Sequence, residues 1–146
     1  VLSAKNLDKI IVKELIPYIN EKYKTNKKQA IAGLSRGSYQ AMLIGTNHPD
    51  LFSAIGSFSP VIYEGTETQP FKELPIENLL KSKSKPFFFM GIGEKEDKRF
   101  IDYDNLLSDY LNQNKYPFVQ YNSAGTYHEW LTWRRCLYEF AQKIFK

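Results

Sequence analysis

The sequence predicts an α/β fold, a three-layer structure with a parallel sheet of about four strands and flanking helices. Two features support this prediction. Helical and strand-like segments alternate along the chain, and the strand-like segments are short apolar runs such as Phe87 to Met90. Continuous apolar runs are typical of parallel strands buried on both faces, which are joined by right-handed crossovers. Reactive groups should therefore lie beyond the carboxyl ends of the strands.

Hydrophobic spacing gives the individual elements. Apolar residues recur at helical spacing from Leu7 to Ile19, and Pro17 is expected to kink this opening helix or restart its last turn. The strands are expected at residues 29–34, 52–58, 86–92 and 118–121, and further helices at residues 37–47, 76–80, 102–112 and 130–145. Residues 66–70 and 81–85 are expected to be polar connections.

Length and composition suit one domain covering residues 1–146, because 42% of the residues are hydrophobic. No apolar run approaches the roughly 20 residues of a membrane span, and the first residues lack a signal-peptide pattern. The net charge of +4 comes from lysines mixed with acids, not from a basic stripe. We therefore expect neither a membrane nor a nucleic acid as partner. The only cysteine, Cys136, cannot form an internal disulfide and leaves the compartment open.

The segment Gly33-Leu34-Ser35-Arg36-Gly37 matches the G-x-S-x-G nucleophile elbow. Small residues on both sides of Ser35 would permit a tight turn that exposes its hydroxyl group, and the motif joins an expected strand to an expected helix. Ser35 is therefore the expected nucleophile. The Arg36 amide, at the helix N-terminus, is expected to be one donor of an oxyanion hole. An ordinary glycine-rich loop is the alternative interpretation.

A serine hydroxyl needs a general base, and the sequence offers two histidines. His48 follows the helix after Ser35, at the end far from the serine, and is expected to be structural. His128 follows the last expected strand and should reach the same sheet edge as Ser35. It is therefore the expected base.

The acid that orients His128 should lie in the loop after residues 86–92. Asp97 is the preferred acid because it allows a slightly longer loop before the next helix, and Glu96 is the alternative. The other carboxylates nearby are expected to be solvated surface charges: Glu94, Asp102 and Asp104.

We expect no metal and no other cofactor. The two histidines are 80 positions apart, no second histidine follows His128 one turn later, and there is no cysteine cluster. Gly91-Ile92-Gly93 lacks the third glycine of a nucleotide-binding loop.

Several segments together resemble the esterase D or feruloyl-esterase-like carbohydrate esterases of the α/β-hydrolase superfamily. They are Ala30 to Gly37, His48 to Phe52, Ser57 to Pro60, and His128-Glu129-Trp130 with Trp133. The resemblance implies the C-terminal half of an α/β-hydrolase fold. It also implies hydrolysis of carboxylic esters on carbohydrate, such as feruloyl or acetyl groups on xylan, often by secreted or cell-surface enzymes without a cofactor.

The sequence departs from this family in two ways. Arg36 and Ser38 stand where the family commonly has Met and Gly, and the family's N-terminal half, with its first strands and second oxyanion donor, has no counterpart. The strand at residues 29–34 would then be an open sheet edge. Because open edges pair or aggregate, we expect a homo-oligomer or a complementing chain there.

Aromatic residues near His128 suggest a platform for an aromatic acyl group or a sugar. Trp130 and Tyr127 are the expected substrate-binding residues, with Trp133 and Tyr63 as further candidates, although aromatics near a terminal helix are often core residues. Three other functions stay open: a catalytically weak or silent binding or oligomerising remnant, a siderophore-type esterase, and an acyltransferase.

Overall fold

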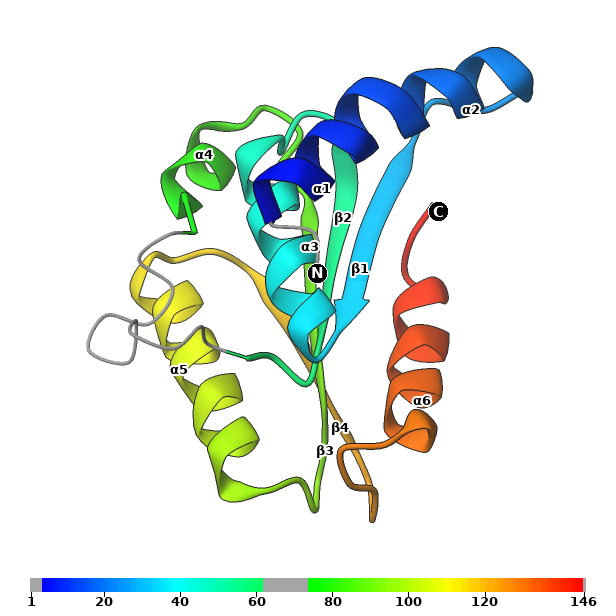
Figure 1. The fold of residues 1–146 in the computed structure, drawn as a ribbon. Coiled ribbons are helices and arrows are strands. Elements are labelled where there is room, and N and C mark those ends of the chain that lie inside the picture. Colours follow the sequence, from blue (N-terminus) through cyan, green and yellow to red (C-terminus); the bar gives the residue numbers. More distant parts are fainter. Residues whose placement is uncertain (1–3, 62–73, 146) are drawn as a thin grey trace.

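A computed structural model describes residues 4–61 and 74–145 of the chain (Figure 1). The expected connection at residues 66–70 and Tyr63 lie outside the described residues. The strands are β1 Gln29–Leu34, β2 Phe52–Phe58, β3 Phe87–Gly93 and β4 Phe118–Ser123. The helices are α1 Ala4–Ile10, η1 Ile11–Leu15, α2 Ile16–Lys22, α3 Arg36–Asn47, α4 Ile76–Lys81, α5 Lys98–Gln113 and α6 Trp130–Ala141.

The four strands form one parallel sheet in the order β1-β2-β3-β4. Figure 1 shows α3 and α5 on one side of this sheet and α6 on the other. The predicted α/β architecture, with four parallel strands and flanking helices, is therefore confirmed. Because all strands run in one direction, the segments after β1, β2, β3 and β4 meet at one edge of the sheet.

Two apolar cores lie on the two faces of the sheet. The larger core packs the sheet against α3, α4 and α5 and includes Met42, Leu79, Phe88 and Leu107, all fully buried. The opening helices α1, η1 and α2 add partly buried residues to its margin. Among the described elements, α6 covers the opposite face.

The face under α6 depends on the close approach of this helix to β3. A Cβ atom added at Gly91 would lie 2.6 Å from the Cys136 sulfur, so a larger residue would push α6 away from the strand. Phe89 and Phe140 complete this second core, with ring centroids 5.7 Å apart. Gly91 therefore sets the distance between α6 and β3. This helix begins two residues after His128, the predicted base.

The opening helix passes through Pro17 by means of a π-helical turn. The Ile16 N–H donates to the Ile11 carbonyl, a bond across five residues, and α2 then begins with Pro17 in its first turn. Proline lacks an N–H and is tolerated at such a starting position. The helix thus restarts at the place where the sequence predicted a kink or a restart.

Two helix boundaries differ from the predicted ones by four residues, and the others agree within one residue or lie at the opening helix. Helix α5 begins at Lys98, four residues early, because Phe100 is buried in its first turn and Lys98 pairs with Asp102 at 2.6 Å. Helix α6 ends at Ala141, not at residue 145. Within the two described segments, no helix has the length and apolar character needed to span a membrane.

Asp104 is buried, contrary to the prediction that it is a solvated surface charge. It lies on α5 with 2% of its surface exposed, and Gln120 donates to its Oδ2 at 2.6 Å. Its Oδ1 has no hydrogen-bond partner among the described residues. Burial raises the pKa of Asp104 from 3.8 to about 6, with the charge of Glu96 adding to the rise and the Gln120 bond opposing it.

We expect Asp104→Asn to stabilise the protein above pH 6. A raised pKa means that the native state binds the proton more tightly than the unfolded state, so stability falls as pH rises from about 4 past about 6. The amide avoids this ionisation and should raise the free energy of unfolding by roughly 1–3 kcal/mol at about pH 8. Urea unfolding near pH 4 and near pH 8 measures the difference.

The exposed Asp109, on the same helix, supplies the control. Asp109→Asn should change the free energy of unfolding by less than about 0.5 kcal/mol at either pH. An effect of Asp104→Asn that is the same at both pH values would contradict the predicted role of ionisation.

Candidate active site

Ser35 occupies a strained turn between β1 and α3. Its φ of 50° lies in the left-handed region, and its N–H donates to the Phe58 carbonyl at 2.8 Å. A Cβ atom at Gly33 would lie 2.0 Å from the Gly37 oxygen, so the turn requires glycine at position 33. Apart from its chain neighbours and the backbone of its own helix, a Cβ atom at Gly37 would meet no described atom within 4 Å. The predicted steric requirement thus holds for Gly33 and is wrong for Gly37 within the described part of the chain.

The N-terminus of α3 directly follows Ser35. Arg36 is the first residue of this helix, and first-turn N–H groups have no partner within their own helix. The buried Ser38 hydroxyl donates to the Ser35 carbonyl at 2.5 Å, which fixes the turn from the helix side. The positive end of the helix therefore lies beside the Ser35 side chain.

His128 reaches Ser35 from the loop between β4 and α6. The distance from His128 Nε2 to Ser35 Oγ is 3.0 Å, although the residues are 93 positions apart. Glu94 Oε2 accepts the Gly125 N–H at 2.7 Å, and buried Thr132 donates to the Tyr127 carbonyl. These bonds hold the loop on both sides of the histidine.

Glu96, and not Asp97, is the carboxylate that contacts His128. The distance from Glu96 Oε2 to His128 Nδ1 is 2.7 Å, and 5% of Glu96 is exposed. The Glu96 N–H donates to the Gly93 carbonyl at 3.2 Å, which tightens the loop after β3. Asp97 is exposed and directly precedes α5. The preference for Asp97 is thereby corrected: the loop is shorter than the sequence argument assumed.

The hydrogen bonds define the state of the imidazole ring. An ionised carboxylate only accepts hydrogen bonds, so Nδ1 of His128 carries the proton and donates to Glu96. In a neutral ring Nε2 is then an acceptor, and the Ser35 hydroxyl donates to it. The arrangement can therefore remove a proton from Ser35 and pass it on.

Two aromatic rings hold the imidazole of His128. Phe100 stacks on it with centroids 4.0 Å apart and an interplanar angle of 14°, and Trp133 meets it edge-on at 5.0 Å. Sequence reasoning missed Phe100 because the helix was expected to start at residue 102. A lone aromatic residue in the charged run Lys98-Arg99-Phe100 was the available signal.

The two expected substrate-binding aromatics are exposed near this site. Trp130 is 69% exposed and packs edge-on against Trp133 at 5.3 Å. Tyr127 is 56% exposed and lies under the Lys95 ammonium group at 5.9 Å. Neither residue belongs to a core cluster of the described chain.

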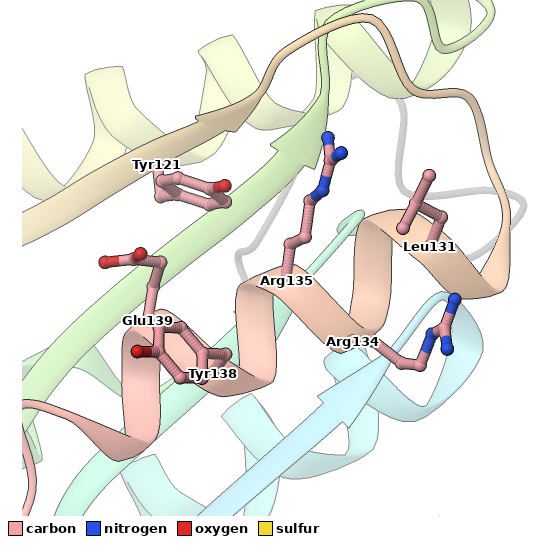
Figure 2. A pocket seen from close by; sticks show the side chains of 6 residues that line it. All are labelled: Tyr121, Leu131, Arg134, Arg135, Tyr138 and Glu139. Carbon is pink, nitrogen blue, oxygen red and sulfur yellow. The ribbon is translucent and has the colours of Figure 1, made fainter.

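A separate hollow lies between α6 and β4 (Figure 2). Its lining residues are Tyr121, Leu131, Arg134, Arg135, Tyr138 and Glu139. In Figure 2 the Arg135 side chain extends from α6 toward the end of β4, where it donates to the Ala124 carbonyl at 3.0 Å. This contact braces the start of the loop that carries His128.

Three other kinds of reactive group are candidates among the described residues: the cysteine thiol, the second histidine and metal ligands. Burial raises the pKa of the Cys136 thiol to about 12, which keeps it from acting as a thiolate. His48 lies beyond the C-terminus of α3 and contacts Asp8 at 2.8 Å. Residues 4–61 and 74–145 contain no cluster of three or more His, Cys, Asp or Glu side chains placed to hold a metal.

Comparison with known proteins places the chain in a family. The protein-family model described as "Putative esterase" matches residues 3–142. The chain belongs to this esterase family. Family membership confirms the resemblance inferred from the elbow and histidine segments.

Individual relatives of the chain also carry esterase names. An endo-1,4-beta-xylanase/feruloyl esterase from Xylanibacter ruminicola is 33% identical over 147 residues, covering 99% of this chain and 18% of that protein. A CE1 ferulic acid esterase from Anaeromyces mucronatus has a similar fold, with a TM-score of 0.77 at 20% identity, covering 94% of this chain and 53% of that one.

An enterobactin esterase from Shigella flexneri shares the fold as well. Its TM-score is 0.73 at 20% identity, and the match covers 97% of this chain and 39% of that one. The chain thus spans about half or less of the length of these relatives.

We expect Glu96→Gln to abolish the low-field NMR resonance of the His128 Nδ1 proton. The carbonyl of the introduced amide would take the position that accepts the Gly93 N–H, so its NH₂ group would face the ring and donate to Nδ1. The ring proton would then move to Nε2. Proton NMR of histidine-labelled protein measures the resonance.

Asp97→Asn is the matched control for this experiment. It removes a neighbouring carboxylate that does not contact the ring, so the resonance should persist. Loss of the resonance in Asp97→Asn, with retention in Glu96→Gln, would restore Asp97 as the partner of His128.

Proposed function

We propose that the chain is a serine esterase that hydrolyses carboxylic esters through an acyl-enzyme, with a catalytic triad of Ser35, His128 and Glu96. The observation that carries the proposal is the continuous path of hydrogen bonds from Ser35 Oγ through the imidazole to a buried carboxylate. The strained turn at Ser35 and membership of the esterase family support it.

The mechanism follows from the roles of these groups. Ser35 Oγ attacks the ester carbonyl carbon while His128 Nε2 takes its proton. The imidazolium, stabilised by Glu96, gives that proton to the departing alcohol as the bond from the acyl carbon to the alkoxy oxygen breaks. Water, activated by His128, then attacks the acyl-enzyme and releases the acid and free Ser35.

The Arg36 amide is the oxyanion donor that we propose from this chain. Arg36 is the first residue of α3, so its N–H has no acceptor within the helix, and it follows Ser35 directly. A missing oxyanion donor typically costs about 2.7–4 kcal/mol of transition-state stabilisation. With one donor alone, turnover should be slower by on the order of a hundredfold to a thousandfold.

The proposed substrates are esters on carbohydrate, of the feruloyl or acetyl type. The named feruloyl esterase activities of the Xylanibacter and Anaeromyces relatives support this class. The exposed rings of Trp130 and Tyr127, on either side of His128 in sequence, could stack on an aromatic acyl group. The fold shared with enterobactin esterase favours a siderophore ester as the second candidate substrate.

A further part of the proposal concerns the edge of the sheet. Among the described strands β1 pairs only with β2, so its other edge offers unpaired backbone groups. An apolar groove follows this edge, lined by residues such as Leu15, Ile16, Ala30 and Phe52. A strand from a second copy, or from a complementing chain, would satisfy the backbone and cover the groove.

We expect Ser35→Ala to reduce hydrolysis of both p-nitrophenyl acetate and methyl ferulate by on the order of a thousandfold or more, because the nucleophile is lost. Labelling by a fluorophosphonate should disappear with it. Trp130→Ala should lower kcat/KM about tenfold for methyl ferulate and less than about twofold for p-nitrophenyl acetate, because only the ferulate carries an aromatic ring on its acyl group.

Tyr138→Ala removes another exposed aromatic side chain from α6 and controls for general effects on this helix. It should leave both activities unchanged. Equal activity of the original chain and Ser35→Ala would disprove the serine mechanism. Equal losses on both substrates in Trp130→Ala would remove the stacking role.

We expect the isolated chain to form a homo-oligomer heavier than the 17.0 kDa monomer in solution, because a β1 edge paired with another strand is more stable than an open one. Size-exclusion chromatography with light scattering, over a hundredfold range of concentration, measures the mass. A single monomeric species at every concentration would show that a second copy does not cover the edge.

A further inference from the structure

We propose that Ser59 and Trp133 act together as a relay that positions the carboxylate of Glu96, with Trp133 setting the direction of the Ser59 hydroxyl. The inference rests on the proposed function, because it concerns the acid of that same triad. Both are positioning residues: they act on His128 and Ser35 through Glu96.

Glu96 Oε1 accepts hydrogen bonds from the relay and from one backbone N–H. The Trp133 Nε1–H donates to Ser59 Oγ at 3.0 Å, and the Ser59 hydroxyl donates to Glu96 Oε1 at 2.5 Å. The Gly93 N–H donates to the same oxygen at 3.1 Å. The relay therefore joins the residue after β2, the end of β3 and the first turns of α6.

The chemistry of these groups permits one direction only. An indole N–H donates and cannot accept, and an ionised carboxylate accepts and cannot donate. The Ser59 hydroxyl group has one hydrogen. Because its oxygen accepts the Trp133 N–H, that hydrogen is donated to Glu96. Oε1 is then occupied by two donors, and Oε2 stays available to His128.

The backbone at Ser59 supports a specific role for its side chain. Its φ of 51° lies in the left-handed region, which a residue other than glycine rarely adopts. The residue is fully buried, and its N–H donates to the Gly91 carbonyl at 2.7 Å. Such strain persists where the surroundings hold it, and it clusters at functional sites.

Ser57, two residues earlier, offers a matched contrast. It is also fully buried, and its hydroxyl has no hydrogen-bond partner among the described residues. Ser57→Ala removes the same atom from the same strand region without touching the relay. It separates loss of the relay from loss of a buried hydroxyl group.

The experiment compares Ser59→Ala, Trp133→Phe, their double variant and Ser57→Ala. Ser59→Ala should lower kcat for p-nitrophenyl acetate about tenfold to a hundredfold, because a hydrogen bond to a charged group is lost. KM should change less than about twofold, and the acidic limb of the pH profile should move to higher pH, because an oxygen without its donor binds a proton more readily.

Trp133→Phe keeps a ring beside His128 and removes the N–H. It should lower kcat several-fold, and the loss should vanish in the Ser59→Ala background, because Trp133 acts through Ser59. Losses that multiply in the double variant would overturn the relay. So would a folded Ser59→Ala that matches Ser57→Ala in kcat and pH profile. If Ser59→Ala does not fold, Trp133→Phe with an unchanged kcat and pH profile overturns it.

The Nδ1 proton resonance of His128 tests the relay without any turnover. Ser59→Ala should shift this resonance, whereas Ser57→Ala should leave it in place. If Ser35→Ala shows that the esterase mechanism is wrong, a shifted resonance still supports the relay. An unshifted resonance in Ser59→Ala overturns the relay even where hydrolysis is established.

Discussion

The buried carboxylate of Glu96 is the constraint on which the functional end of this molecule depends. A charge removed from water is costly unless donors replace its hydration. Here the donors come from separate segments: His128 from the loop after β4, Ser59 from the position directly after β2, and Gly93 from the end of β3. Satisfying one carboxylate thus brings three strand ends into a fixed arrangement. In this arrangement the imidazole of His128 faces the hydroxyl group of Ser35.

The rest of the fold supplies the rigid frame for this carboxylate. Parallel strands bring the ends of β1, β2, β3 and β4 to one edge, and the lack of a side chain at Gly91 lets α6 lie against β3. Because α6 also carries Trp133, its depth decides whether the indole N–H reaches Ser59. Packing on the sheet face and hydrogen bonding at the sheet edge are therefore coupled through a single helix.

Much of the site could be predicted from local sequence. The elbow pentapeptide gave Ser35, and only His128 follows a strand on the correct edge, so nucleophile and base could be placed before the structure. The acid could not be placed in this way. Glu96 and Asp97 are adjacent carboxylates, and only the conformation of the loop decides which of them faces His128. Asp104 was misplaced for another reason: its charge suggested a solvated position, although its spacing from Leu107 and Leu111 puts it on the buried face of α5.

The sequence by itself determined the class of fold, the order of the strands and helices, and the two reactive residues that local motifs mark. These properties follow from hydrophobic periodicity and from the steric demands of a tight turn, which act over a few residues. Tertiary structure alone decided that Glu96 meets His128, that Phe100 stacks on the imidazole, and that Ser59 and Trp133 lie behind the carboxylate. The physical reason is that these contacts join residues dozens of positions apart, whose distances are set by helix packing on the sheet.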